Sequence, residues 1–258
     1  MARVHQRIAQ GKGAKKWVLD LCSGTQSFRR WKEEHRMDEY EVVSLDIDPL
    51  TDPDICIDVM DWKRRACDRG LFDMIWASPP CTYYSKLNYR AGEEDLAGAD
   101  AIVRRIMAII AHFQPRKWFL ETPGTGKLLH RGVMDGRFPP IIVDYCQYSS
   151  KEEFGYRKRT AIFTNAMGFV PRTCYRPTCP SIENGCHINS FGGSKTLPAA
   201  VTHRVPTDLI DHLVWAGEVT VAGHEALAKC SHGPMLATAD PVGWGVCLRL
   251  RAPQEGVE

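Results

Sequence analysis

The chain of 258 residues contains no apolar run near the ~20 residues that a membrane-spanning helix needs. Neither sign of charge dominates, because 33 Lys and Arg residues nearly balance 31 Asp and Glu residues. Contact with a polyanion would therefore depend on local basic clusters. The start of the chain lacks the apolar core of a secretory signal. We expect an intracellular protein without a membrane partner, in the cytoplasm or nucleoid, or in a host cell nucleus if its source is viral or eukaryotic.

Several common signatures are also missing. Ten cysteines are scattered through apolar runs without the dense spacing of a disulfide-stapled small domain, so we expect them to be reduced. No Gly-x-Gly-x-x-Gly follows a strand, and Gly124-Thr-Gly-Lys127 lacks the spacing of a phosphate-binding loop. The composition, 44% hydrophobic and 25% charged, is typical of one large α/β domain, alone or with a small appendage.

Short apolar runs alternate with helical patterns along the first two thirds of the chain. Strands are predicted over 16–21, 40–46, 54–58, 72–77, 118–120, 139–146 and 159–164, the last two as a candidate antiparallel pair. Helices are predicted over 27–36, 98–113 and 203–217. This alternation favours a parallel sheet with helices on both faces.

Polar residues that could do chemistry fall where predicted strands end. They are Asp20, Asp46, Asp58, Cys81 and Glu121. Ligands of open α/β sheets bind in the crevice outside the carboxyl ends of the strands. We therefore expect these side chains to share one site.

The turn from Asp20 to Thr25 follows the first strand directly. Its Gly24 allows backbone N–H groups to approach a ligand closely. Asp46, at the end of the second strand, could accept hydrogen bonds from ribose hydroxyls. Together they indicate a site for a nucleoside cofactor, although a simple strand-to-helix loop would have the same pattern at Asp20.

Ser78-Pro-Pro-Cys81 is the more specific motif. Two prolines fix the backbone just after a strand and hold the next side chain in a defined place. A cysteine at that place is a candidate nucleophile if nearby positive charge favours its thiolate. A buried structural cysteine is the alternative, and it is our interpretation of most other cysteines in the chain.

Five segments in this order resemble the motifs of DNA (cytosine-5) methyltransferases. They are Asp20-Leu-Cys-Ser-Gly24, Ser78-Pro-Pro-Cys81, Phe119-Leu-Glu121-Thr-Pro123, Tyr156-Arg-Lys-Arg159 and His203-Arg-Val-Pro206. The likeness spans residues 17 to about 216, and the compact length is similar to that of small phage- and virus-type members. It implies a Rossmann-like, S-adenosylmethionine-dependent methyltransferase sheet with helices on both faces and a small, loop-rich recognition segment.

The resemblance also implies roles for individual residues. Cys81 would add to carbon 6 of a flipped cytosine in DNA, and Glu121 would hydrogen-bond the ring N3 and the exocyclic amine. Arg157 and Arg159 would orient the base and Cys81 and favour the thiolate. The residues expected to contact S-adenosylmethionine are Asp20, Cys22, Ser23, Gly24, Thr25, Asp46, Ile47, Asp58, Val59 and Pro79.

The same pattern suggests a division of the chain. We expect a basic leader over 1–16, a catalytic domain over 17–165, a short recognition-like segment over 166–198, a closing motif and helix over 199–217 and an extension over 218–258. We expect a monomer that acts on a short DNA sequence around a cytosine. Two alternatives stay open, namely a tRNA cytosine-5 methyltransferase and a DNA-binding relative without catalysis.

A cluster of metal-ligand residue types lies in the recognition-like segment. Cys174, Cys179, Cys186 and His187 are four residues of the kinds that bind structural zinc. Their spacing is irregular, and the adjacent pair Cys186 and His187 is awkward for one tetrahedral ion. Our main expectation is therefore that the protein holds no metal, with a zinc site as the alternative.

Overall fold

The computed structural model describes residues 6–7, 11, 13–63, 69–86, 88–134, 136, 138–149, 155–189 and 198–215. All of them belong to one unit, Met1–Thr220. The extension expected over 218–258 and much of the leader expected over 1–16 lie outside the described residues. Within the described part of the chain, none of the helices qualifies as a membrane span.

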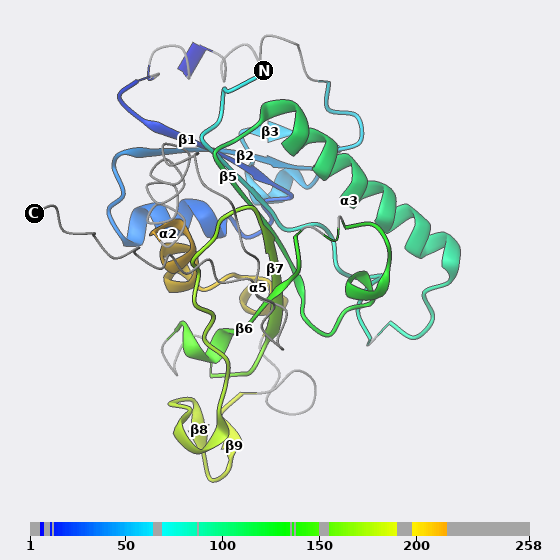
Figure 1. Cartoon of the computed structure of the whole chain (residues 1–258), viewed down its shortest axis with the longest axis vertical. Coiled ribbons are helices and arrows are strands. Elements are labelled where there is room, and N and C mark those ends of the chain that lie inside the picture. The colour runs from blue at the N-terminus through cyan, green and yellow to red at the C-terminus, as the bar shows by residue number, and fades with distance from the viewer. Residues whose placement is uncertain are drawn as a thin grey trace, which may run out of the picture. The chain divides into compact units, whose positions relative to one another are not determined.

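The fold is built on a seven-stranded sheet (Figure 1). Its strands are β1 (Lys16–Leu21), β2 (Tyr40–Asp46), β3 (Ile55–Cys56), β4 (Met74–Ala77), β5 (Lys117–Pro123), β6 (Ile141–Asp144) and β7 (Arg159–Thr164). The spatial order is β3-β2-β1-β4-β5-β7-β6. Neighbours from β3 to β5 are parallel, whereas β7 is antiparallel to both β5 and β6. The predicted antiparallel pair is thus confirmed.

Both faces of the sheet are covered. Alternate residues of β1 enter two separate hydrophobic clusters, with Leu19 in one and Val18 in the other. Helix α3 (Glu93–Phe113) packs on the first face, and α2 (Ser27–Glu34) packs on the second together with a helix over 207–215. Figure 1 shows α3 and α2 on opposite sides of the strands. The expected Rossmann-like sheet with helices on both faces is confirmed.

Helix α3 begins five residues earlier than expected, at Glu93 instead of Gly98. The apolar repeat marks only the buried stripe, from Leu96 to Phe113. The first turn is acidic, with Glu93 followed by two more acids, which favours a helix N-terminus through the macrodipole. The helix ends at Gln114 in the left-handed conformation, directly before Pro115.

The remaining short elements lie in connections. They are η1 (Pro49–Thr51), η3 (Lys127–His130), η4 (Tyr145–Gln147), η5 (Arg176–Thr178), α5 (Ala199–Thr202) and a two-stranded hairpin of β8 (Ile182–Glu183) and β9 (Cys186–His187). The segment from 165 to 189 contains only η5 and this hairpin, in line with its loop-rich sequence.

The reversed direction of β7 brings the start of that strand to the carboxyl edge of the parallel strands. Glu121 of β5 pairs with Ile162, and Pro123 pairs with Thr160. The residues that precede Thr160 therefore lie beside the end of β5. A parallel strand in the same place would have brought its last residues there instead.

Candidate functional site

Asp20 lies near the end of β1 with 1% of its surface exposed. Neither of its carboxylate oxygens has a hydrogen-bond partner among the described residues. Burial, reinforced by the charge of Asp46 and opposed by that of Arg29, raises the pKa of Asp20 to about 8. A buried carboxyl group with two unused oxygens is costly unless a ligand satisfies it.

The turn after β1 is folded against the end of β2. Cys22 has φ 55° and Gly24 has φ 43°, both in the left-handed region. The N–H of Gly24 donates to Asp46 Oδ2 at 2.7 Å, and the N–H of Ser23 donates to the carbonyl of Leu45 at 3.1 Å. Burial and the charge of Asp46 raise the pKa of the Cys22 thiol to about 12, so this thiol stays protonated at neutral pH.

Asp46, the last residue of β2, and Ile47, which follows it, lie in different environments. Asp46 Oδ1 accepts the N–H of Asp48 at 2.9 Å, so each carboxylate oxygen already accepts one backbone N–H. An oxygen has room for a second donor, which keeps a ribose contact feasible. The side chain of Ile47 is 64% exposed. It offers an apolar surface to a flat ring.

The other predicted cofactor contacts lie around the same strand ends. Asp58 accepts the N–H of Met60 at 2.8 Å, and Thr25 Oγ1 lies 3.3 Å from Ser27 Oγ. Val59 is buried in the cluster under α3, so its side chain contacts the core. Pro79 is buried and follows β4.

Cys81 is held in a loop that several hydrogen bonds fix. The N–H groups of Tyr84 and Ser85 donate to the carbonyl of Cys81 at 3.1 and 2.9 Å. The carbonyl of Tyr84 in turn accepts a hydrogen bond from the N–H of Lys127 at 2.8 Å. The hydroxyl of Tyr84 donates to Asp100 Oδ1 at 2.8 Å. The Cys81 side chain is half-buried, so its sulfur is neither locked in the core nor open to bulk water.

Glu121 lies in β5, the strand next to β4, two residues before the strand ends, and is 7% exposed. Its Oε1 accepts the hydroxyl of Tyr145 at 2.9 Å and lies 3.6 Å from Lys158 Nζ. Burial and the Glu121 charge raise the pKa of the Cys81 thiol, whereas Lys158 lowers it. The charge of Lys158 therefore favours the Cys81 thiolate, and the same role expected of Arg157 and Arg159 stays a prediction.

Arg157 and Arg159 share one partner, Asp144 at the end of β6. Their Nε atoms lie 3.1 and 3.3 Å from Asp144 Oδ1, and the Asp144 side chain is fully buried. Hydrogen bonds from the Cys174 N–H and both arginines hold the pKa of Asp144 below its usual range despite its burial. Both arginine side chains remain more than a third exposed, and each guanidinium group has further N–H donors for another ligand.

Sequence reasoning did not single out Lys158, Tyr145 and Asp144. Lys158 stands between the two predicted arginines, and Tyr145 and Asp144 belong to the predicted strand 139–146. One signal in the sequence could have identified them. Asp144 and Tyr145 lie near the end of the predicted strand 139–146, and that strand was the candidate partner of the strand that follows the arginine motif. Strand register, which the pattern did not specify, decides which of these groups meet Glu121.

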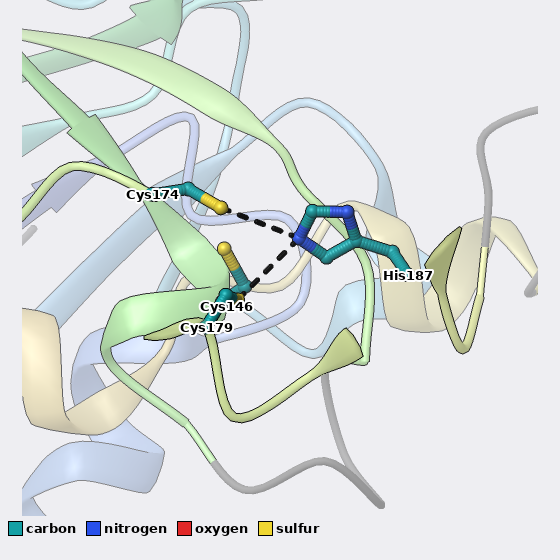
Figure 2. Close-up of side chains that lie close together, drawn as sticks. All are labelled: Cys146, Cys174, Cys179 and His187. Atoms are coloured by element: carbon teal, nitrogen blue, oxygen red, sulfur yellow. Dashed lines mark hydrogen bonds between the residues drawn. The ribbon is translucent and has the colours of Figure 1, made fainter. Parts of the chain in front are cut away.

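The structure brings three of the four predicted zinc candidates together and replaces the fourth. Cys174, Cys179 and His187 meet Cys146, and their four ligand atoms all lie within 4.8 Å of one another (Figure 2). Cys186 is exposed and is not part of this group. The reason is the hairpin, because adjacent residues of β9 point to opposite faces.

No protein-family model matches the chain. It is 38% identical over 179 residues to the probable DNA (cytosine-5)-methyltransferase of Frog virus 3 (isolate Goorha), covering 64% of this chain and 78% of the relative. Two solved structures are distantly similar. They are a candidate DNA modification methyltransferase from an E. coli prophage (14% identity, TM-score 0.42) and the Entamoeba histolytica methyltransferase EhMeth (11% identity, TM-score 0.45). Each match covers 62% of this chain. The matched part is 52% of the prophage methyltransferase chain and 57% of the EhMeth chain.

The virus relative is similar enough, over enough of its length, to define the family. The chain belongs to the DNA (cytosine-5)-methyltransferase family and is an enzyme of the methyltransferase class. The resemblance seen in the motifs from Asp20 to Pro206 is thus confirmed at the level of the family.

Proposed function

We propose that this enzyme methylates carbon 5 of cytosine in DNA, with Cys81 as its covalent nucleophile and S-adenosylmethionine as the methyl donor. The observation that carries the proposal is that a thiol and a carboxylate lie at the carboxyl edge of adjacent parallel strands, close enough for the carboxylate charge to act on the thiol. Cys81 follows β4, Glu121 lies two residues before the end of β5, and the Cys81 pKa responds to the charges of Glu121 and Lys158.

The residues at the ends of β1 and β2 fit S-adenosylmethionine. Asp20 presents two buried oxygens without partners, which suit a cationic group of the donor. Ile47 offers an exposed apolar surface that suits the adenine ring, and Asp46 has capacity for ribose hydroxyls. When bound, the donor supplies an electrophilic methyl group.

The substrate chemistry needs a nucleophile because carbon 5 of cytosine is too electron-poor to attack a methyl group. The Cys81 thiolate forms a bond to carbon 6, and the ring electrons become available at carbon 5. Glu121 hydrogen-bonds the ring N3 and the exocyclic amine, where charge changes as the sulfur adds. Carbon 5 gains the methyl group as the bond between that methyl group and the donor sulfur breaks and leaves a neutral thioether. The carbon-5 proton then passes to solvent, and the bond between Cys81 sulfur and carbon 6 breaks to restore the thiolate.

Lys158 and Tyr145 position Glu121 for this role. The Tyr145 hydroxyl and the Lys158 ammonium both face Glu121 Oε1, so that oxygen is oriented before substrate arrives. The exposed sides of Arg157 and Arg159 lie at the same sheet edge and suit a phosphate or base of a flipped nucleotide.

The test compares Cys81→Ala with Cys186→Ala, a change at an exposed cysteine outside the site. Tritium transfer from labelled S-adenosylmethionine to duplex DNA should vanish in the first variant and persist in the second. Wild-type protein should also form a denaturation-resistant adduct with DNA that contains 5-fluorocytosine, because fluorine cannot leave as a proton. Residual cytosine methylation by Cys81→Ala would refute the nucleophile, and transfer to tRNA but not to DNA would refute the substrate.

A further inference from the structure

Four potential metal ligands converge outside the proposed catalytic centre. Cys146 lies in η4 directly after β6, Cys174 precedes η5, Cys179 ends η5, and His187 lies in β9. Figure 2 shows the His187 ring pointing its nitrogen toward the three sulfur atoms. One nitrogen and three sulfur atoms, contributed by separate parts of the chain, thus surround a single point.

The spacing of the donor atoms matches that of ligands on one ion. His187 Nε2 lies 3.5 Å from Cys174 Sγ and 3.6 Å from Cys179 Sγ. In a tetrahedral zinc site with Zn–S of about 2.3 Å and Zn–N of about 2.0–2.1 Å, sulfur and nitrogen are about 3.5–3.6 Å apart. All four ligand atoms lie within 4.8 Å of one another, and binding of one ion would bring pairs of sulfur atoms to about 3.8 Å.

Hydrogen bonding within the cluster does not account for this geometry. A single imidazole nitrogen carries either one proton or one lone pair, so it cannot bond two thiols equally. The thiol is moreover a weak donor. All three cysteines are free of disulfides, and any one disulfide would leave the third sulfur and the imidazole without a role. A metal ion uses all four groups at once.

The surroundings also suit metal-bound thiolates. Gln147 Nε2 lies 3.4 Å from Cys179 Sγ and 3.8 Å from Cys146 Sγ, so an amide N–H group faces two of the sulfurs. N–H donors around the sulfurs are the usual outer-shell partners of metal ligands. Within residues 165–189 only two-residue strands and one short 3-10 helix form, so this segment has little core of its own.

We propose that Cys146, Cys174, Cys179 and His187 bind one structural zinc ion that fastens the segment 174–187 to the end of β6. Three thiolates and an imidazole form a closed four-ligand set, which is typical of structural zinc. The proposal corrects the set expected from sequence spacing by exchanging Cys186 for Cys146. It does not depend on the proposed reaction, since metal binding can be measured without substrate.

The site is also joined to the arginines at the sheet edge. Cys146 follows Asp144 by two residues, and the Cys174 N–H donates to Asp144 Oδ2 at 2.8 Å. Asp144 is the shared partner of Arg157 and Arg159. Zinc binding would therefore fix the carboxylate that orients both guanidinium groups, which makes its ligands positioning residues.

The decisive experiment measures the zinc content of the full chain after expression in zinc-supplemented medium and gel filtration. We expect one equivalent of zinc in the wild type and in Cys186→Ser, and almost none in Cys146→Ser. A wild type without bound zinc would overturn the proposal. If Cys186→Ser lost zinc and Cys146→Ser kept it, the ligand would be Cys186, as the spacing in the sequence suggested. That result would overturn the proposed ligand set with Cys146.

A second pair of variants covers the case that Cys146→Ser does not fold. His187→Cys keeps four ligands and should retain zinc, whereas His187→Ala should lose it. Replacement of zinc by cobalt should give the intense visible absorption of tetrahedral thiolate ligation in the wild type and in His187→Cys. Equal zinc content in His187→Cys and His187→Ala, or cobalt absorption typical of six oxygen ligands, would contradict the site.

Discussion

The free carboxyl group of Asp20 makes a sharp prediction about cofactor binding. With a pKa of about 8, Asp20 is mostly protonated at neutral pH in the protein without ligand. Its two oxygens have no partner in the described structure, so a cationic group of S-adenosylmethionine would be the first to pair with them. Binding then requires the ionised form, and the donor should bind more tightly as the pH rises toward about 8.

The size of the effect follows from the ionised fraction. That fraction is about a tenth at pH 7 and about nine tenths at pH 9, so the affinity gains about tenfold over this interval. In Asp20→Asn the side chain is neutral at every pH, and this gain should be absent. S-adenosylmethionine has an ionisable amine of its own, but that titration affects both proteins equally and cancels in the ratio of their dissociation constants.

The assay is calorimetric titration of S-adenosylmethionine into the wild type and Asp20→Asn between about pH 6 and pH 9. We expect the ratio of the variant's Kd to the wild type's Kd to rise about tenfold between pH 7 and pH 9. A ratio that stays constant with pH would show that Asp20 does not pair with the cofactor. Equal affinities of both proteins at pH 9 would show the same.

The same pKa has a consequence for the unfolding of the free enzyme. A carboxyl group whose pKa is raised on folding stabilises the folded state only while it stays protonated, so that contribution is complete below about pH 4 and is lost as the pH rises through about 8. Asp20→Asn should remove this slope. Denaturant unfolding at several pH values in the absence of cofactor measures it directly.

Three further substitutions test the site and the core. Lys158→Met should raise the Cys81 pKa and move the alkaline rise of the methylation rate to higher pH, lowering the rate near neutral pH by about tenfold or more, as a pH–rate profile would show. Tyr145→Phe removes a hydrogen bond to the Glu121 carboxylate worth about 1.5–3 kcal/mol, and kcat should fall more than KM rises in steady-state kinetics. Ile106→Ala opens a cavity in the fully buried face of α3 and should cost about 2–5 kcal/mol in the free energy of unfolding, measured by denaturant titration.

Each of these changes has a matched control. Lys32→Met removes a lysine that pairs with Glu41 away from the catalytic strand ends, so the pH–rate profile should not move. Tyr89→Phe alters an exposed tyrosine and should leave kcat unchanged. Arg104→Ala lies on the exposed side of α3 and should cost far less than Ile106→Ala. A control that behaves like its partner variant would contradict the assignment in question.

The strand ends were the most predictable part of this molecule. Apolar runs that lead to Asp20, Asp46 and Glu121 indicated the last part of β1, β2 and β5, because a buried strand must be apolar until it nears the edge of the sheet. The end of β5 itself lies three residues beyond the predicted strand 118–120, at Pro123. The first turn of α3 was missed for the opposite reason. Its residues are polar and solvent-facing, so no apolar repeat marks them.

Contacts between segments far apart in the sequence were the least predictable part. The spacing of Cys174 and Cys179 suggested a local ligand set with Cys186, but pairing in the hairpin turns Cys186 outward, and Cys146 from far upstream takes its place. The two arginines were identified by a motif, yet their shared partner Asp144 depends on the register of β6 against β7. Motifs name residue types, whereas register decides which of them meet.

The reversal of β7 has a consequence for the path of the chain. Because β7 starts beside Pro123, at the carboxyl edge of the parallel strands, it runs toward the opposite edge of the sheet, and the chain after Thr164 has to return to reach Asp144. By Cys174 that return is complete, since its N–H donates to Asp144. A returning stretch of this kind can change in length and sequence without disturbing the strand before it. Its contact with Asp144 is the point that would have to be preserved for the orientation of Arg157 and Arg159 to stay the same.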